Sequence, residues 1–404
     1  MRRNARQPTE AKTASGSKND TYDATTAITA NTTTTKHTAI TQDTIVSKLT
    51  PVERWRQNVL VPRGIEIVDD QGYDLALDHF SYFGTDEKQC REWIRRRLES
   101  EKDEDTVFLR GGDGFNTKIA RQYTEITARN LCEEEFGTFA KTKLFTTPDF
   151  LPIEPKEKTW KAQRMIQLYT QPNTKCASLW VPPPLLSGEE YFGKDFYLKP
   201  DCTYWLSLQS SSKYNRGLVS AVTFTIRNRD TTPYLTIEFK SEGTVEQAIN
   251  QATAASSLAL FNRYRLKENR LRASKKNWNR KHFDQIRHYM MTFTGPIAVI
   301  WVVRLKLSAA SDASYSKVDW NGCEAVRLLQ CDCTTAIGVG DLVDWINAIH
   351  RWGEMHGAYC RRDVKAVLLA KSTGVAKRVS DLLDPADPIE DDEDEEDGQT
   401  AKKA

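Results

Sequence analysis

Three charged residues occur at a spacing that could gather them around one point. Asp201 follows Pro200, while Glu238 and Lys240 lie two residues apart within residues 233–240. That run is rich in β-branched and aromatic residues, which predicts a strand. Side chains alternate between the two faces of a strand, so we expect Glu238 and Lys240 on the same face.

Residues 201–208 form a second candidate strand, with Pro200 at its start, where no ladder donor is needed. If the two strands are neighbours, Asp201 and Glu238 could share a hard cation, Mg²⁺ or Mn²⁺. Such an ion polarises a phosphoryl oxygen and lowers the pKa of its bound water. Lys240 would position that water or stabilise the developing charge, which suits phosphodiester hydrolysis. The alternative is an ordinary solvated strand face without catalytic function.

The elements around these strands are expected to hold the site. Residues 218–226 are predicted to form a strand between them. A helix should start at Thr244, with Gln247 as its capping-box partner, and run to about Leu266. Gln251 lies four residues after Gln247 and so on the same helix face. The amide of either glutamine is expected to reach a phosphate or Lys240.

This order of residues resembles the PD-(D/E)xK nuclease superfamily, and most of all its fungal nuclease-like proteins. The likeness covers residues 179–255, through Pro200-Asp201, Glu238-Phe239-Lys240 and the helix bearing Gln251. It implies an α/β, restriction-endonuclease-like core with a central mixed β-sheet flanked by helices. It also implies that Asp201 and Glu238 bind metal with help from the Phe239 carbonyl, that Lys240 is catalytic, and that Gln251 supports the site.

The superfamily pattern includes a glutamate on a preceding helix. Residues 117–139 are predicted to form one helix, on which Glu135 shares the apolar face through its spacing from Leu131 and Phe139. Glu135 is therefore preferred as a third metal ligand over three other acids, Glu125, Glu133 and Glu134. The alternative is that this acidic group is a solvated patch.

Charge is strongly segregated along the chain. Residues 384–397 hold ten acids and no base, so a net charge of +2 for the whole chain becomes +12 for the rest. Residues 263–288 contain ten Lys or Arg, interleaved with Tyr264, Trp278 and Phe283. Cations can neutralise phosphates and rings can stack on bases, so we expect nucleic acid as the partner, with DNA preferred over RNA. The alternative is a solvated helix face.

The predicted organisation has three parts. Residues 1–50 are a Thr-rich tail and residues 371–404 an acidic tail, both expected to be disordered. Residues 51–370 are expected to be the nuclease-like domain, with a helical part (51–178) and a catalytic core (179–370). Within them we predict helices starting at Thr50-Pro51 and spanning 86–98 and 340–360, and strands at 296–307 and 324–331.

No apolar run is long enough to cross a bilayer, and no secretory signal is visible, so an intracellular location, nuclear or cytoplasmic, is expected. The alternative to an enzyme is a catalytically inactive relative that binds nucleic acid or protein. A third possibility is an effector-like interaction protein without a nucleic-acid role.

Overall fold

The computed structural model describes residues 49–69, 109, 111–145, 161–163, 179–187, 198–208, 213–241, 244–306 and 318–371. The predicted helix 86–98 and almost all of both predicted tails lie outside these ranges. The first helix, α2 (Pro51–Trp55), begins as predicted, because Thr50 and Glu53 form a reciprocal capping box. A π-helical turn (Arg56–Leu60) and a 3₁₀ turn (Val61–Arg63) continue the chain from α2.

The described strands form one mixed sheet of eight strands. Its order is β1-β8-β7-β6-β5-β3-β2, and β4 pairs with β5. The pairs β1/β8 and β5/β6 are parallel and the others are antiparallel. The strand bounds are β1 (Ile65–Val68), β2 (Lys161–Gln163), β3 (Cys202–Ser207), β4 (Thr225–Ile226), β5 (Asp230–Lys240), β6 (Arg287–Thr294), β7 (Ile297–Leu305) and β8 (Cys323–Asp332).

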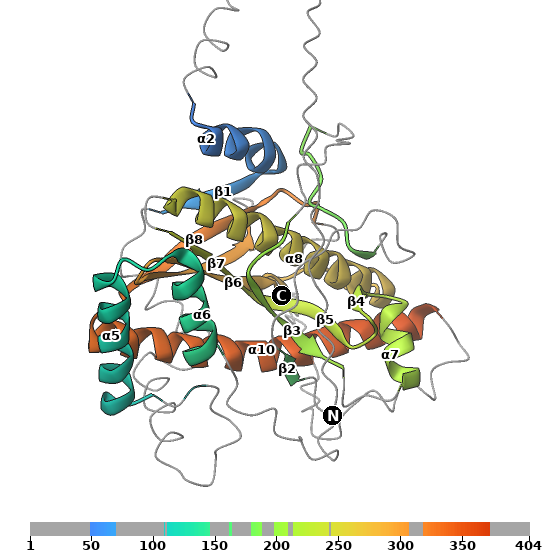
Figure 1. The fold of residues 1–404 in the computed structure, drawn as a ribbon. Helices are drawn as coiled ribbons and strands as arrows, with labels where there is room; N and C mark the ends of the chain where they lie inside the picture. Colours follow the sequence, from blue (N-terminus) through green and yellow to red (C-terminus); the bar gives the residue numbers. More distant parts are fainter. Residues whose placement is uncertain are drawn as a thin grey trace, which may run out of the picture. The chain divides into compact units, whose positions relative to one another are not determined.

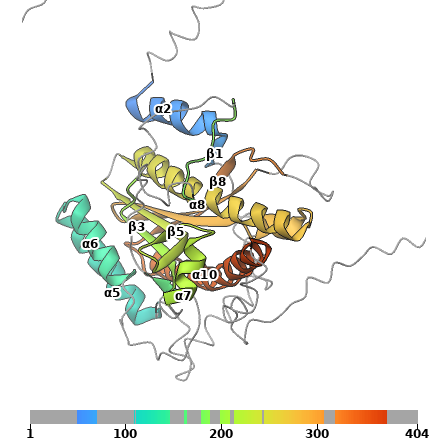
Figure 2. The same ribbon diagram turned by 90° about the vertical axis from the view of Figure 1, so that its right-hand side faces the viewer.

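Helices cover both faces of this sheet, as Figures 1 and 2 show. On one face, α8 (Val245–Ser274) packs through buried small residues, among them Ala252, Ala255 and Ala259. On the other face, α10 (Ala336–Lys371) packs through Leu342, Ile346 and Ile349. The predicted α/β class, a central mixed sheet flanked by helices, is therefore confirmed.

Of the three strands predicted around the site, two are confirmed and one is wrong. Residues 201–208 and 233–240 lie on β3 and β5, which are direct antiparallel neighbours. Residues 218–226, predicted as a strand, begin instead inside a helix, α7 (Lys213–Ser220), and only β4 is extended. Val219 and Val222 are buried in the core, so packing outweighs the modest strand preference of β-branched side chains.

The later elements follow the predictions, although β7 is shorter than expected and the others are longer. β7 and β8 are the strands expected at 296–307 and 324–331, and α10 extends the helix expected at 340–360. α8 continues to Ser274 instead of ending near Leu266. β6 and the short helix α9 (Arg280–Asp284) were not predicted.

The single helix predicted over 117–139 is wrong. The chain forms α5 (Asp113–Ala128) and α6 (Glu133–Lys143), separated by Asn130 in the left-handed region at φ 53°. Asn tolerates that conformation better than most residues. Because of this break, the face assigned to Glu135 on one continuous helix does not apply to α6.

Among the described helices, none combines the length and apolar composition that would let it cross a membrane.

Candidate functional site

The pairing of β3 with β5 places Asp201 beside Glu238. Cys202 lies opposite Ile237 in the register, so the residues just outside that pair also meet. The Phe239 N–H donates to Asp201 Oδ2 at 2.8 Å, and the Asp201 N–H donates to Glu238 Oε2 at 3.3 Å. These two bonds fix both carboxylates at the end of β5.

Lys240 lies two residues after Glu238 and turns its amine back to the same point. Its Nζ is 2.8 Å from Glu238 Oε1 and 3.9 Å from Asp201 Oδ2. It also donates to the Phe239 carbonyl at 2.8 Å. The alternation of side chains along β5 produces this geometry, because Phe239 points to the opposite face and stacks on Phe293.

A third carboxylate, Glu133, reaches this point from α6. Its Oε1 accepts from Lys240 Nζ at 3.3 Å, and its Oε2 accepts from the Ser241 N–H at 3.0 Å. Gly137 lets α6 approach β5, since a Cβ there would lie 3.3 Å from Cγ of Phe239. We call Glu133, Asp201, Glu238 and Lys240 the lysine cluster.

The predicted helix residue, Glu135, is not part of this cluster. Its side chain is exposed, and its Oε2 accepts from the Cys132 N–H at 2.9 Å, which caps its own helix. The prediction assumed a continuous helix, and the break at Asn130 turns Glu133 toward the site instead. The sequence does contain a signal for a new helix here. Three consecutive acids, Glu133, Glu134 and Glu135, follow shortly after Asn130, and acidic residues favour the first turn of a helix.

Burial sets the electrostatics of the lysine cluster. Burial and the neighbouring Asp201 carboxylate raise the pKa of Glu238 to about 7, although Lys240 opposes that shift. For Lys240, burial alone would lower the pKa, but the carboxylates of Glu238, Asp201 and Glu133 outweigh it and raise it. The ammonium is therefore held charged, while Glu238 titrates near neutral pH.

The donor set is chemically suited to a hard divalent cation, since it consists of carboxylate oxygens and the Phe239 carbonyl. Within the described ranges, however, no three His, Cys, Asp or Glu side chains are arranged to hold a metal ion. The cation around which these oxygens gather is the ammonium of Lys240. The Asp201 and Glu133 side chains are 33% and 39% exposed, so the cluster is open to solvent on one side.

The predicted glutamines lie near the start of α8 without a bond to the cluster. Gln247 is exposed and Gln251 is half-buried. No hydrogen bond between described residues joins Gln251 to Asp201, Glu238 or Lys240, so its supporting role stays a prediction. The predicted capping box is absent, because the Thr244 hydroxyl donates to the Ser241 carbonyl at 2.8 Å and does not cap the helix.

The basic segment 263–288 differs most from its prediction. Three of its cations are buried around Asp363, at 2.5, 3.0 and 3.5 Å from its carboxylate oxygens: Arg263, Lys267 and Arg270. We call these four residues the aspartate cluster. Tyr264 and Trp278 stack on each other and are buried, so they are not presented for bases. The segment also starts about 27 Å along α8, at 1.5 Å per residue, and so is not beside the lysine cluster.

Comparisons of the chain with protein-family models, curated proteins and solved structures find no match. A mixed sheet flanked by helices supports many unrelated functions, so the architecture alone does not specify one. The functional argument therefore depends on the geometry and chemistry of the lysine cluster.

Proposed function

We propose that this protein is a nuclease, which hydrolyses phosphodiester bonds of nucleic acid with a divalent cation, Mg²⁺ or Mn²⁺, on a restriction-endonuclease-like core. One observation carries the proposal: carboxylates from three separate segments converge with Lys240 at the end of one strand. The resemblance of Pro200-Asp201 and Glu238-Phe239-Lys240 to the PD-(D/E)xK pattern supports it.

Each group of the cluster has a role in this proposal. Asp201, Glu238 and Glu133 would hold the cation together with the Phe239 carbonyl. The cation supplies charge stabilisation at the phosphoryl oxygen and a water of lowered pKa. Lys240 would donate hydrogen bonds to that water or to the phosphate oxygens as their charge develops. Gln251 would orient neighbouring groups from α8.

Charge supports nucleic acid as the substrate class. Outside residues 384–397 the chain carries a net charge of +12, which attracts a polyanion. Four of the cations in the segment 263–288 remain on the surface: Arg272, Lys275, Arg280 and Lys281. DNA is the first substrate to test. Intracellular action, nuclear or cytoplasmic, belongs to the same proposal.

The second candidate is an inactive relative that only binds nucleic acid or protein. A specific observation favours it, because the ammonium of Lys240 already lies among the oxygens that a metal would need. In an active enzyme that amine must yield part of its contacts when the cation enters.

A plasmid-nicking assay separates the two candidates. We expect supercoiled DNA to be cut in Mg²⁺ or Mn²⁺, and cutting to stop in EDTA and in the Glu238→Ala and Lys240→Ala variants. Glu134→Ala is the matched control, since Glu134 is an exposed acid of the same helix turn as Glu133. Cleavage that persists in both site variants would rule out this active site.

If no DNA is cut, a gel-shift assay tests whether the protein binds nucleic acid. Binding through phosphate contacts should weaken as the salt concentration rises. Without cleavage or shift, a protein-interaction role is left.

A further inference from the structure

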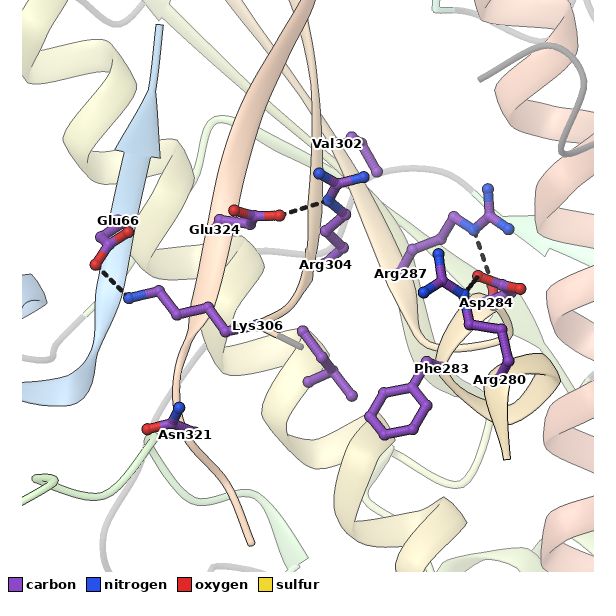
Figure 3. Close-up of a pocket in the computed structure, with 11 residues that line it drawn as sticks. Glu66, Arg280, Phe283, Asp284, Arg287, Val302, Arg304, Lys306, Asn321 and Glu324 are labelled. Carbon is purple, nitrogen blue, oxygen red and sulfur yellow. Dashed lines mark hydrogen bonds and ion pairs between the residues drawn. The ribbon is translucent and has the colours of Figure 1, made fainter. Parts of the chain in front are cut away.

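A second site is suggested by a cavity at the opposite end of the sheet. Its volume is about 540 Å³, and it lies where β6 and β8 begin and β7 ends (Figure 3). Arg287 opens β6, whereas Thr294, the neighbour of Lys240, closes it. At about 3.3 Å per residue, that separates the two places by roughly 23 Å along the strand. The cavity is therefore distinct from the lysine cluster.

A row of charged side chains crosses four strands at this cavity. The register pairs Glu66 with Glu324, Glu324 with Arg304, and Arg304 with Arg287. Like charges directly opposite each other on a sheet are destabilising. Glu324 and Asp284 already lie near the Arg304–Arg287 pair, but the four cations of the wall exceed its three acids by one. The net positive charge that is left favours an anionic ligand.

The basic side chains of the cavity are held in place by their neighbours. Arg304 Nε donates to Glu324 at 2.6 Å, and Lys306 pairs with Glu66. Arg287 Nε donates to the Asp284 carbonyl at 2.9 Å, and its guanidinium lies 4.6 Å from the ring centre of Trp352. A guanidinium carries five N–H donors, so Arg304 can serve a ligand while its Nε holds Glu324.

The wall of the cavity combines this charge with an apolar surface. Four cations face three acids, and Phe283 and Leu305 supply the apolar part, as Figure 3 shows for Phe283. A phosphate offers several acceptor oxygens and up to two negative charges, which suits arginines from neighbouring strands better than one carboxylate does. A ring beside Phe283 would bury apolar surface.

We propose that this cavity binds a small organic phosphate with a planar ring, of the nucleoside monophosphate class. Arg287 and Arg304 hold the phosphate, Phe283 packs on the ring, and the acids of the wall accept from ligand hydroxyl groups. This binding does not depend on the proposed nuclease function.

Calorimetry in EDTA tests the proposal with three probes: adenosine monophosphate, adenosine and inorganic phosphate. We expect the monophosphate to bind, Arg304→Gln to weaken it at least tenfold, and Phe283→Leu to weaken it without affecting inorganic phosphate. Arg327→Gln is the matched control, because Arg327 on β8 is 37% exposed and ion-paired with Asp69, much as Arg304 is 41% exposed and paired with Glu324. The control should bind like the unaltered protein.

Several outcomes would overturn the assignment. They are no binding of monophosphate or phosphate at millimolar concentration, equal loss in Arg304→Gln and Arg327→Gln, and adenosine binding as well as its monophosphate. Binding that is lost in Glu238→Gln would move the ligand to the lysine cluster and refute the cavity. If Arg304→Gln fails to fold by circular dichroism, Lys306→Gln replaces it with the same expectation.

Discussion

The lysine cluster and the aspartate cluster are built on the same plan with opposite charge. In the first, three carboxylates surround one ammonium; in the second, three cations surround one carboxylate. They differ in exposure. Asp201 and Glu133 are each about one-third exposed, whereas no side chain of the aspartate cluster exceeds 8%. An open cluster can exchange its partner for a ligand, and a closed one can only hold the fold.

The aspartate cluster joins the two long helices. Asp363 on α10 contacts cations that all lie on α8. Burial alone would raise the pKa of Asp363, but Lys267, Arg263 and Arg270 outweigh it and lower the pKa to about 2. This carboxylate therefore stays charged under ordinary conditions and neutralises part of a buried positive charge.

The largest expected effect comes from removing that carboxylate. Asp363→Asn leaves three buried cations without their counter-ion, which should lower the free energy of unfolding by about 3–5 kcal/mol. Urea denaturation measures it. The control is Glu125→Gln, which removes the acid of an exposed pair with Arg121 and should change little. Equal effects of the two substitutions would refute a structural role for the aspartate cluster.

Removing a carboxylate from the lysine cluster should have the opposite effect, a loss of activity without a loss of stability. Glu238→Gln should reduce the rate of DNA cleavage by on the order of 100-fold, because that is the usual cost of removing one charge-stabilising group from an active site. Its stability should be unchanged or higher, because burial and Asp201 disfavour the Glu238 charge. Cleavage rates and urea curves of the same preparation give both quantities. A large loss of stability would show that this cluster is structural as well.

Lys240 gives a smaller and more specific effect. Lys240→Gln removes a positive charge 2.8 Å from Glu238, so Mn²⁺ affinity should rise about tenfold while cleavage is lost. Calorimetric titration with Mn²⁺ alone measures the affinity, with Lys141→Gln of α6 as the control. If Mn²⁺ binds more weakly to Lys240→Gln, the ammonium does not compete with the metal.

The pH dependence of stability gives the finest distinction. The pKa of Glu238 is raised to about 7 in the folded protein, so near pH 6 the folded chain keeps a proton there that the unfolded chain has lost. The contribution of Glu238 to the free energy of unfolding therefore falls as pH rises from about 4.5 to 7. Burial lowers the pKa of His288 and His350 to about 3, so their contribution falls as pH drops from about 6.5 toward 3. Glu238→Gln should therefore gain stability more steeply than the unaltered protein between pH 4.5 and 7. Parallel curves would contradict this account of Glu238.

Local pattern was enough to predict the strands that carry the site. The β-branched run at 233–240 and the placement of Pro200 gave β5 and the start of β3, and alternation put Glu238 and Lys240 on one face. The run at 287–294, which ends at the turn Gly295-Pro296, is also typical of a strand, but β6 was not predicted because the cations before it favoured a helix face or a binding segment.

What depended on distant contacts could not be predicted. Glu133 is in the cluster because α6 restarts after Asn130 and packs on Phe239 through Gly137. The cations of 263–288 are buried because Asp363, far along the chain, lies against α8. A charge pattern alone cannot distinguish a solvated surface from such an internal pair.

The most direct test compares Glu133→Gln with Glu135→Gln in the plasmid-nicking assay with Mn²⁺. The two residues are acids two positions apart on the first turn of α6, but only Glu133 bonds Lys240. The account predicts that Glu133→Gln cuts at least tenfold more slowly while Glu135→Gln cuts at the unaltered rate. Equal rates in the two variants, or loss only in Glu135→Gln, would contradict it.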